Sequence, residues 1–195
     1  MRVVVATGNR GKLGELTALL APLGVDLLPQ SAYGVEPPPE TGTTFLSNAL
    51  IKARHAARVA QLPAVADDSG LEVDALGGAP GVYTARYAGD GSDAAANNAK
   101  LLKALTGVPP EKRRARFRAI IVFVRSAVDP HPLVGEGVWE GRIALAPRGI
   151  GGFGFDPLFE PLDSTRTAAE LTSDDKNARS HRGAALRALV AQWPR

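Results

Sequence analysis

The sequence predicts an α/β protein built around a mixed central sheet. In the first half of the 195-residue chain, short apolar segments rich in β-branched residues alternate with segments whose leucines and alanines recur at helical spacing. Two longer strand-like segments then follow one another across Asp129–Pro132, which indicates an antiparallel pair. We therefore expect a sheet that contains both parallel and antiparallel pairing.

The first three elements predict a right-handed β–α–β unit. Residues 3–6 form a short apolar strand that ends at Gly8–Asn9. The leucines between residues 13 and 20 recur at helical spacing, and Pro22 helps to end that helix. Residues 25–28 form a second strand, which the crossover rule makes parallel to the first.

The next segments predict a long helix and a third strand. A proline-rich loop over 33–40 precedes a helix that Thr43 or Thr44 can cap and that runs to about Ala60. The third strand, 64–66, is expected to end where two aspartates, a serine and a glycine follow, because these residues favour turns.

The second half of the chain predicts the remaining elements without an interrupting linker. They are a helix over about 92–105, strands over 115–126 and 133–146, a glycine-rich loop over 149–154, a capping box at Thr167 and Glu170, and a helix over about 181–193. We expect residues 1–195 to form a single domain.

Composition excludes several classes of protein. The chain has no cysteine, so disulfide scaffolds, thiolate metal sites and cysteine nucleophiles are excluded. A formal net charge of +3, from 23 lysines and arginines against 20 aspartates and glutamates, permits an anionic partner without naming it. No apolar run approaches the roughly 20 residues of a membrane helix, and the apolar N-terminus is too short for a signal peptide. We therefore expect a cytoplasmic protein with no membrane partner.

The segment Thr7–Lys12 is a candidate phosphate-binding loop. It joins the first strand to the first helix, where free backbone amides bind anions and glycines allow close approach. Lys12 adds a charge, although Leu13 follows where a Walker A loop needs serine or threonine. On the residues alone, an ordinary turn with a helix cap is as good an interpretation as a phosphate-binding loop.

Asp67 and Asp68 are candidate magnesium ligands at the end of the third strand. Parallel strands bring their carboxyl ends to one edge of a sheet, and carboxylates opposite a phosphate loop suit Mg²⁺. Successive strand residues point to opposite faces, so both carboxylates reach one site only if the turn has already begun. On this evidence alone, a turn without a ligand is the favoured interpretation.

Other polar residues flank the long helix. Glu40 precedes that helix and is either a ligand or a solvated acid that suits the helix dipole. Asn48, Lys52 and His55 form one polar stripe, and most such stripes face solvent. We assign no function to His55.

Two segments near the end of the chain are open to two interpretations each. Gly149–Gly154 has the spacing of a dinucleotide-binding loop, but Pro157 follows instead of a helix, so that function is rejected. Phe153 or Phe155 can stack on a base or lie buried. Lys176, His181 and Arg182 can bind an anionic or oxo-bearing ligand or act as local caps.

The basic segment Lys112–Arg118 suggests nucleic acid. However, Arg114, Arg116 and Arg118 alternate with smaller or apolar residues, as on a strand with one solvated face. The solvated face is the favoured interpretation. A basic single-stranded nucleic-acid or nucleotide-binding module without turnover is the alternative.

The motifs in their order along the whole chain resemble the inosine/xanthosine triphosphate pyrophosphatase family, the non-canonical purine NTP pyrophosphatases. The resemblance rests on Thr7–Lys12, Glu40–Phe45 with Asn48 and Lys52, Ala66–Leu71, Gly78–Gly81, Gly152–Pro157 and Ser180–Gly183. It implies an α/β/α fold with an elongated mixed sheet, two lobes with an active-site cleft between them, and a homodimer.

The resemblance also implies roles for individual residues. Thr7, Gly8, Asn9, Arg10, Gly11 and Lys12 would bind the triphosphate together with Lys52 and Lys176, while Ser69 would contact substrate. Glu40 and Asp68 would bind Mg²⁺, Asp68 would also be the general base, and Asp67 would assist. Phe153 would stack on the purine, in a pocket completed by Gly154, Phe155, Asp156, His181 and Arg182.

The implied reaction is Mg²⁺-dependent hydrolysis of ITP, dITP and XTP to the nucleoside monophosphate and pyrophosphate, which clears these nucleotides from the pool. No stable nucleic-acid partner is expected. A donor such as Arg182 aimed at O6 would discriminate against adenine, because it would meet another donor there. A related pyrophosphatase acting on other modified nucleotides is a further alternative.

Overall fold

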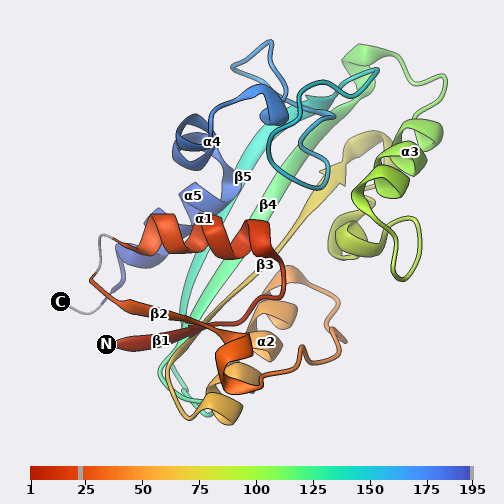
Figure 1. Cartoon of the computed structure of the whole chain (residues 1–195). Helices are drawn as coiled ribbons and strands as arrows, with labels where there is room; N and C mark the ends of the chain where they lie inside the picture. Colours follow the sequence, from red (N-terminus) through yellow and green to blue (C-terminus); the bar gives the residue numbers. More distant parts are fainter. Residues whose placement is uncertain (22–23, 194–195) are drawn as a thin grey trace. The chain divides into compact units, whose positions relative to one another are not determined.

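The computed structural model describes residues 1–21 and 24–193 (Figure 1). Pro22, predicted to help end the first helix, lies outside the described residues. The strands are β1 (Arg2–Val5), β2 (Asp26–Pro29), β3 (Ala64–Val73), β4 (Arg114–Val124), β5 (Leu133–Ile143) and β6 (Phe159–Pro161). The α-helices are α1 (Arg10–Leu20), α2 (Phe45–Ala60), α3 (Ala94–Ala104), α4 (Ser173–Arg179) and α5 (His181–Val190).

The strands form one mixed sheet in the order β2-β1-β3-β4-β5-β6. β1 pairs in parallel with β2 and with β3, and Val4 lies opposite Leu28 on one side and Ala64 on the other. β6 pairs antiparallel with β5. The predicted mixed α/β fold and the predicted parallel opening pair are therefore confirmed.

β3 differs from its prediction. It continues to Val73 instead of ending at Asp67, and nearly all of its residues are buried. Aspartate, serine and glycine disfavour strands on their own, but tertiary partners override that preference here. Asp67 is paired with buried cations, and the Leu71 amide donates to Thr84 Oγ1 at 2.9 Å. The sequence also gave no signal for β6 or α4.

The described residues divide into two compact units. The first comprises those within Met1–Asp68, Ala119–Gly137 and His181–Arg195. The second comprises Ser69–Arg118 and Val138–Ser180. None of the helices within the described ranges is long and apolar enough to span a membrane.

In the first unit, helices cover both faces of the strands. Val3, Val5 and Val65 point toward α1 and α5, whose buried residues join the same apolar cluster. The alternate strand residues face α2, which presents alanines because small side chains let a helix lie close to a sheet. Thr44 caps α2 with a capping box, which confirms the predicted start of this helix.

Two glycines of β5 fix the position of α5. A Cβ atom at Gly137 would overlap the carbonyl oxygen of His181, and one at Gly135 would overlap the carbonyl oxygen of Ala185. The backbone of α5 therefore lies directly on β5, which no larger residue at these positions would permit. This contact sets where His181 and Arg182, the first two residues of α5, are held.

In the second unit, three aromatic rings form the centre of the core. The Phe159 ring centre lies 4.5 Å from that of Phe117 and 5.3 Å from that of Trp139. Phe155 is 2% exposed and belongs to the same cluster.

The basic segment before and within β4 behaves as a strand with one solvated face. Ala115 and Phe117 are buried, while Arg116 pairs with Asp74 at 2.9 Å and Glu140 at 3.1 Å. Arg113 is buried and donates to backbone carbonyls. Because the four arginines of this segment have internal partners, it does not support the nucleic-acid interpretation.

Candidate active site

The predicted site residues fall into two groups, one in each compact unit. The first group lies where β1 leads into α1, in β3, in and before α2, and at the start of α5. The second group lies in β3 beyond Asp68, in the glycine-rich loop and in α4.

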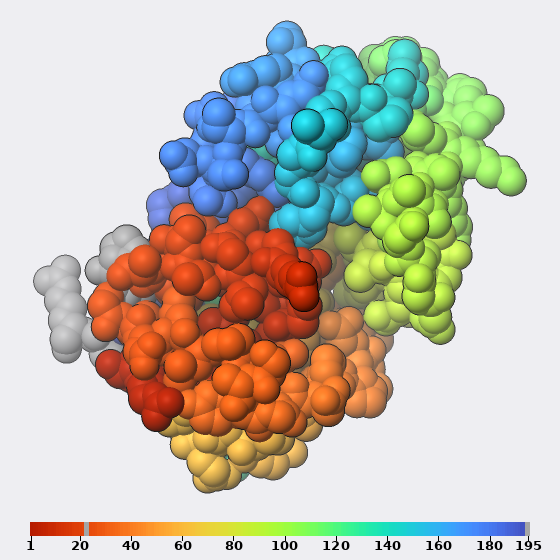
Figure 2. Space-filling view, in the orientation of Figure 1, coloured from red at the N-terminus to blue at the C-terminus, as the bar shows by residue number. Residues whose placement is uncertain are grey.

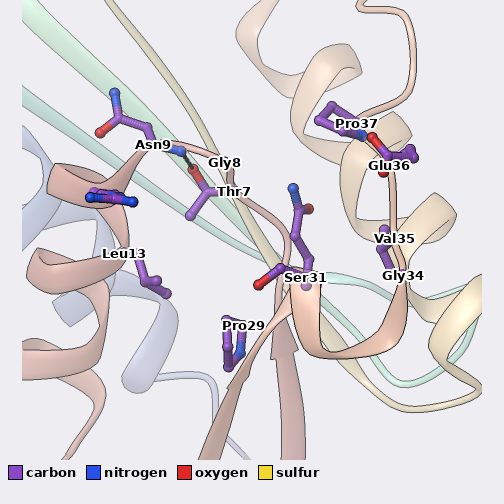
Figure 3. Close-up of a pocket in the computed structure, with 12 residues that line it drawn as sticks. Thr7, Gly8, Asn9, Leu13, Pro29, Ser31, Gly34, Val35, Glu36 and Pro37 are labelled. Atoms are coloured by element: carbon purple, nitrogen blue, oxygen red, sulfur yellow. Dashed lines mark hydrogen bonds between the residues drawn. The ribbon is translucent and has the colours of Figure 1, made fainter.

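The loop between β1 and α1 is ordered by its own polar side chains. Asn9 caps α1, because its Oδ1 accepts from the Lys12 amide at 3.1 Å. Thr7 Oγ1 accepts from the Asn9 amide at 3.2 Å (Figure 3). A Cβ at Gly8 would meet nothing nearer than Gln30 Nε2 at 3.9 Å. Packing therefore does not require glycine here, and the bare backbone leaves room for a ligand.

This loop lines a cavity of about 420 Å³. Its other walls come from the end of β2 and from the segment before α2, and Figure 3 shows their side chains around the opening. In the space-filling view, the residues near the start of α1 and those preceding α2 lie side by side on one face (Figure 2). The cavity is lined by Thr7, Gly8, Asn9, Arg10, Leu13, Pro29, Gln30, Ser31, Gly34, Val35, Glu36 and Pro37.

Asp67 is held between two cations, the buried Arg182 and the largely buried Lys12. Lys12 Nζ lies 2.6 Å from Asp67 Oδ1, and Arg182 Nε lies 3.2 Å from Asp67 Oδ2. Burial alone would raise the pKa of Asp67, but the charges of Arg182 and Lys12 outweigh it and hold that pKa well below its usual range. Burial lowers the pKa of Lys12, an effect that outweighs the attraction of Asp67.

Lys52 joins the other two carboxylates of this group. Its Nζ lies 2.7 Å from Asp68 Oδ1 and 3.0 Å from Glu40 Oε1. Burial raises the pKa of Asp68, and the charge of Glu40 adds to this against the opposing charge of Lys52. Burial opposes the charged form of Lys52, but the attraction of Asp68 and Asp67 prevails and raises its pKa.

Glu40 is positioned by the docking of its loop onto α2. The Gly42 amide donates to Asn48 Oδ1 at 2.8 Å, and a Cβ at Gly42 would overlap the Ser47 and Asn48 side chains. Asn48 is 1% exposed. The prediction that Asn48 belongs to a solvent-facing stripe is therefore wrong, because the loop before the helix covers it.

Asp67 and Asp68 form ion pairs with different lysines. Because β3 continues through both residues, their side chains point to opposite faces of the sheet. Asp67 faces α1 and α5, where Lys12 and Arg182 lie, whereas Asp68 faces α2 and Lys52. The interpretation of these aspartates as members of a turn is wrong.

Glu40 and Asp68 provide oxygen ligands of the kind that a hard divalent cation prefers. Their carboxylates converge on one cationic atom, Lys52 Nζ. Among residues 1–21 and 24–193, no three acidic or histidine side chains gather as a complete metal site. Magnesium commonly takes one or two carboxylates and completes its shell with water and substrate phosphates. The two carboxylates therefore fit Mg²⁺ shared with a phosphorylated ligand.

The start of α5 is enclosed. His181 is 4% exposed and Arg182 is 1% exposed. The Arg182 guanidinium contacts Glu15 of α1 through Nη1, in addition to Asp67. This gives Arg182 carboxylate partners inside the protein, which does not favour its predicted contact with a purine O6. Sequence reasoning missed Glu15, although its place three residues after Lys12 puts both on one helix face.

In the second unit, Asp156 organises the glycine-rich loop. Its Oδ2 accepts from the Phe153 amide at 2.8 Å and from Lys176 Nζ at 2.6 Å. Lys176 Nζ also lies 4.6 Å from the centre of the Phe153 ring, in a cation–π contact. Gly152 has a φ of 69°, and a Cβ there would overlap the Asp156 carboxylate. Three predicted site residues are thus brought together.

The remaining residues of this group have distinct surroundings. Asn98 of α3 donates to the Gly154 carbonyl at 3.0 Å and so ties the loop to that helix. Phe155 lies in the core, and the prediction that it contacts substrate is not favoured by its burial. Phe153 is partly exposed, as is Ser69 in β3. Of the two phenylalanines, only Phe153 offers a ring surface for stacking.

The chain is similar to known proteins over nearly its whole length. The model of the Ham1 family matches residues 3–192. A dITP/XTP pyrophosphatase of Thioalkalivibrio sulfidiphilus is 57% identical over 190 residues, covering 97% of each chain. One of Escherichia coli O157:H7 is 53% identical over 189 residues, covering 97% of this chain and 96% of the relative.

Solved structures show the same similarity. A HAM1 protein from Coxiella burnetii superposes with a TM-score of 0.90 at 46% identity, over 98% of both chains. The Ham1 protein of Staphylococcus aureus gives a TM-score of 0.86 at 36% identity, over 98% of this chain and 97% of that one. Together with the family match over nearly the whole sequence, these similarities show that the chain belongs to the Ham1 family.

Proposed function

We propose that this chain hydrolyses the non-canonical purine nucleoside triphosphates dITP, ITP and XTP to the nucleoside monophosphate and pyrophosphate. The observation that carries the proposal is the convergence of Glu40 and Asp68 on Lys52, in the same unit as the Lys12 loop. Relatives that are 53–58% identical over nearly the full length are named dITP/XTP pyrophosphatases, which supports the same activity.

The triphosphate would bind at the loop that begins α1. The amides at a helix N-terminus carry partial positive charge, and Lys12 and Lys52 add full charges. A chain of phosphates neutralises these cations better than water does, since each lysine is at least partly buried. Gly8 leaves its backbone open on the cavity side, as the space around it indicates, whereas the amides of Thr7 and Asn9 donate within the chain.

Asp68 is suited to be the general base. Its pKa is raised by burial and by Glu40, so its carboxylate binds a proton more strongly than an ordinary aspartate. The hydrogen bond from Lys52 fixes the orientation of Asp68 Oδ1. Asp68 would accept one proton from a water molecule while that water attacks the triphosphate.

Glu40 and Asp68 would also hold Mg²⁺. When bound, Mg²⁺ supplies neutralisation of the triphosphate charge. Formation of a monophosphate and pyrophosphate requires that one P–O bond of the bridge between the α- and β-phosphates breaks. The water oxygen bonds to the phosphorus that is attacked, and the bridging oxygen leaves with the other product. The two lysines would stabilise the negative charge of the leaving group.

The base would stack on Phe153. One side of this ring is near Lys176, and the cation–π contact together with the Asp156 hydrogen bond holds the ring in place. Stacking is tolerant of the identity of the base, so discrimination between 6-oxo and 6-amino purines needs polar groups in addition.

The test is a pyrophosphate-release assay with dITP, ITP, XTP and ATP, with and without Mg²⁺. We expect release from the first three nucleotides, little from ATP and none after chelation of Mg²⁺. Asp68→Asn removes the base and should abolish release while the circular dichroism spectrum stays unchanged. Failure to release pyrophosphate from any of these nucleotides in the presence of Mg²⁺ would disprove the proposal.

We also propose that the enzyme acts as a homodimer on the cytoplasmic nucleotide pool. The expected homodimer is checked by analytical ultracentrifugation, in which a monomer at micromolar concentration would contradict it. The role in clearing the pool is checked by measuring dITP in cells that lack the gene, which should accumulate it.

A further inference from the structure

A second cavity lies beside α2 and shares no lining residue with the cavity at the loop that begins α1. It encloses about 430 Å³ and is formed by the segment that precedes α2 and by one face of that helix. Figure 1 shows this segment running alongside α2. The cavity is lined by Pro38, Pro39, Thr41, Ile51, Arg54, His55 and Arg58, and this set includes no acidic side chain.

The two arginines in this cavity lack the carboxylate partners that other arginines of the chain have. Arg116, Arg148 and Arg182 each contact at least one carboxylate. Across residues 1–21 and 24–193, neither Arg54 nor Arg58 makes an ion pair. They stand four residues apart on one helix face, where like charges repel each other.

The guanidinium of Arg54 is also poorly satisfied by hydrogen bonds. Nη2 donates to the Asp129 carbonyl at 3.4 Å, which is long for such a bond. Nε is buried and has no acceptor among the residues that the structure describes. A buried donor without an acceptor is costly, so a ligand that lets this guanidinium shift toward it would be stabilising.

We infer that this cavity binds a small phosphate anion, inorganic phosphate or pyrophosphate, at a site separate from the nucleotide site. The planar guanidinium of arginine matches the oxygens of phosphate, and Thr41 supplies a hydroxyl next to the two arginines. The lining contains no phenylalanine, tyrosine or tryptophan ring, and its one imidazole, that of His55, lines the cavity together with two arginines, so the compact anion is favoured over a nucleotide.

An anion here would act on the candidate metal ligand through the chain. Glu40 lies between Pro39 and Thr41, which both line the cavity, and Lys52 follows Ile51, which also lines it. An anion bound between the segment and α2 would hold these two parts together. The Glu40–Lys52 pair, at 3.0 Å, is therefore expected to become more rigid when the anion is bound.

The test is an NMR titration that follows the side-chain Nε–Hε signals of Arg54 and Arg58. Inorganic pyrophosphate and inorganic phosphate are added separately to the full chain, in EDTA, at an ionic strength held constant with NaCl. We expect a saturable shift of both signals. In Arg58→Gln, the Kd measured from the Arg54 signal should rise by about tenfold. A response to pyrophosphate alone identifies the reaction product as the ligand, and a response to both identifies free phosphate as sufficient.

Two variants separate this site from other effects. Lys103→Gln/Lys112→Gln removes two exposed charges elsewhere and should leave the affinity unchanged within about twofold. Lys12→Gln weakens the nucleotide loop and should leave the Arg54 response intact. The inference is wrong if NaCl gives the same shift, if no saturation occurs, or if Lys12→Gln abolishes the response. Since no turnover is measured, this result is independent of the pyrophosphatase assay.

Discussion

Lys12 and Asp67 form a largely buried ion pair, with Lys12 Nζ 2.6 Å from Asp67 Oδ1. Asp67 has a fully buried side chain and also contacts Arg182, so a single carboxylate neutralises part of two cations. Arg182 in turn contacts Glu15. This network connects β3, α1 and α5, and it holds the loop that begins α1 in place.

Asp67→Asn should strongly destabilise the protein. The variant leaves Lys12 and Arg182 buried with too little negative charge, which costs about 3–5 kcal/mol in the free energy of unfolding. Urea denaturation followed by circular dichroism measures this. Asp26→Asn is the matched control, because the Arg2–Asp26 pair is exposed and should contribute less than about 1 kcal/mol. Equal effects of both substitutions would contradict the burial argument.

The contribution of Asp67 to the free energy of unfolding should disappear only at acidic pH. The folded-state pKa of Asp67 is depressed below the unfolded value of about 3.9, so its stabilising effect is fully present above that value. The effect is lost progressively as the pH falls from there toward the folded-state pKa. Unfolding free energies of the wild type and Asp67→Asn should therefore differ by a constant amount from pH 7 to about pH 5 and converge below pH 4. If the two unfolding free energies already converge at pH 6, the pH dependence of stability is controlled by a group other than Asp67.

Two glycines should respond differently to alanine. Gly137→Ala introduces a Cβ that overlaps the His181 carbonyl, so we expect a loss of about 3 kcal/mol or more in stability. Gly8→Ala meets only Gln30 Nε2 at 3.9 Å and should change stability by less than about 1 kcal/mol. It should nonetheless lower kcat/KM by about tenfold or more, because the new methyl group lies where the phosphates approach. Thermal melts and steady-state kinetics on dITP distinguish these effects.

Alanine substitutions at Phe153 and Phe155 should have different effects, the first mainly on substrate binding and the second mainly on stability. Phe155→Ala opens a cavity in the core of the second unit and should cost about 3–5 kcal/mol. Phe153→Ala removes a partly exposed ring and its contact with Lys176, which should cost about 1 kcal/mol of stability. The KM for dITP should rise in Phe153→Ala because the stacking surface is lost. An unchanged KM in that variant would remove Phe153 from base binding.

Much of the fold follows from local sequence patterns. The alternation of arginines with Ala115 and Phe117 predicts a strand with one solvated face, and the structure has that strand. The threonine before α2 predicts the start of this helix, and Thr44 caps it. These features depend on near neighbours in the chain, so the sequence is sufficient to predict them.

The candidate site depends on contacts between distant residues. Asn48 looks like a solvent-facing residue until the loop at Gly42 covers it. Phe155 and Phe153 are equivalent in sequence, and only the core of the second unit separates the buried ring from the partly exposed one. Glu15 enters the site because α5 lies against α1 and brings Arg182 to it.

The sequence by itself determined the class of fold, the order of most elements and the set of charged residues available for chemistry. The tertiary structure decided which of these charges meet. Asp67 and Asp68 are neighbours with turn-forming preferences, yet β3 continues through both because buried cations on one face and Lys52 on the other compensate their carboxylates. Such compensation comes from residues 16 to 115 positions away in the chain, and no local pattern encodes it.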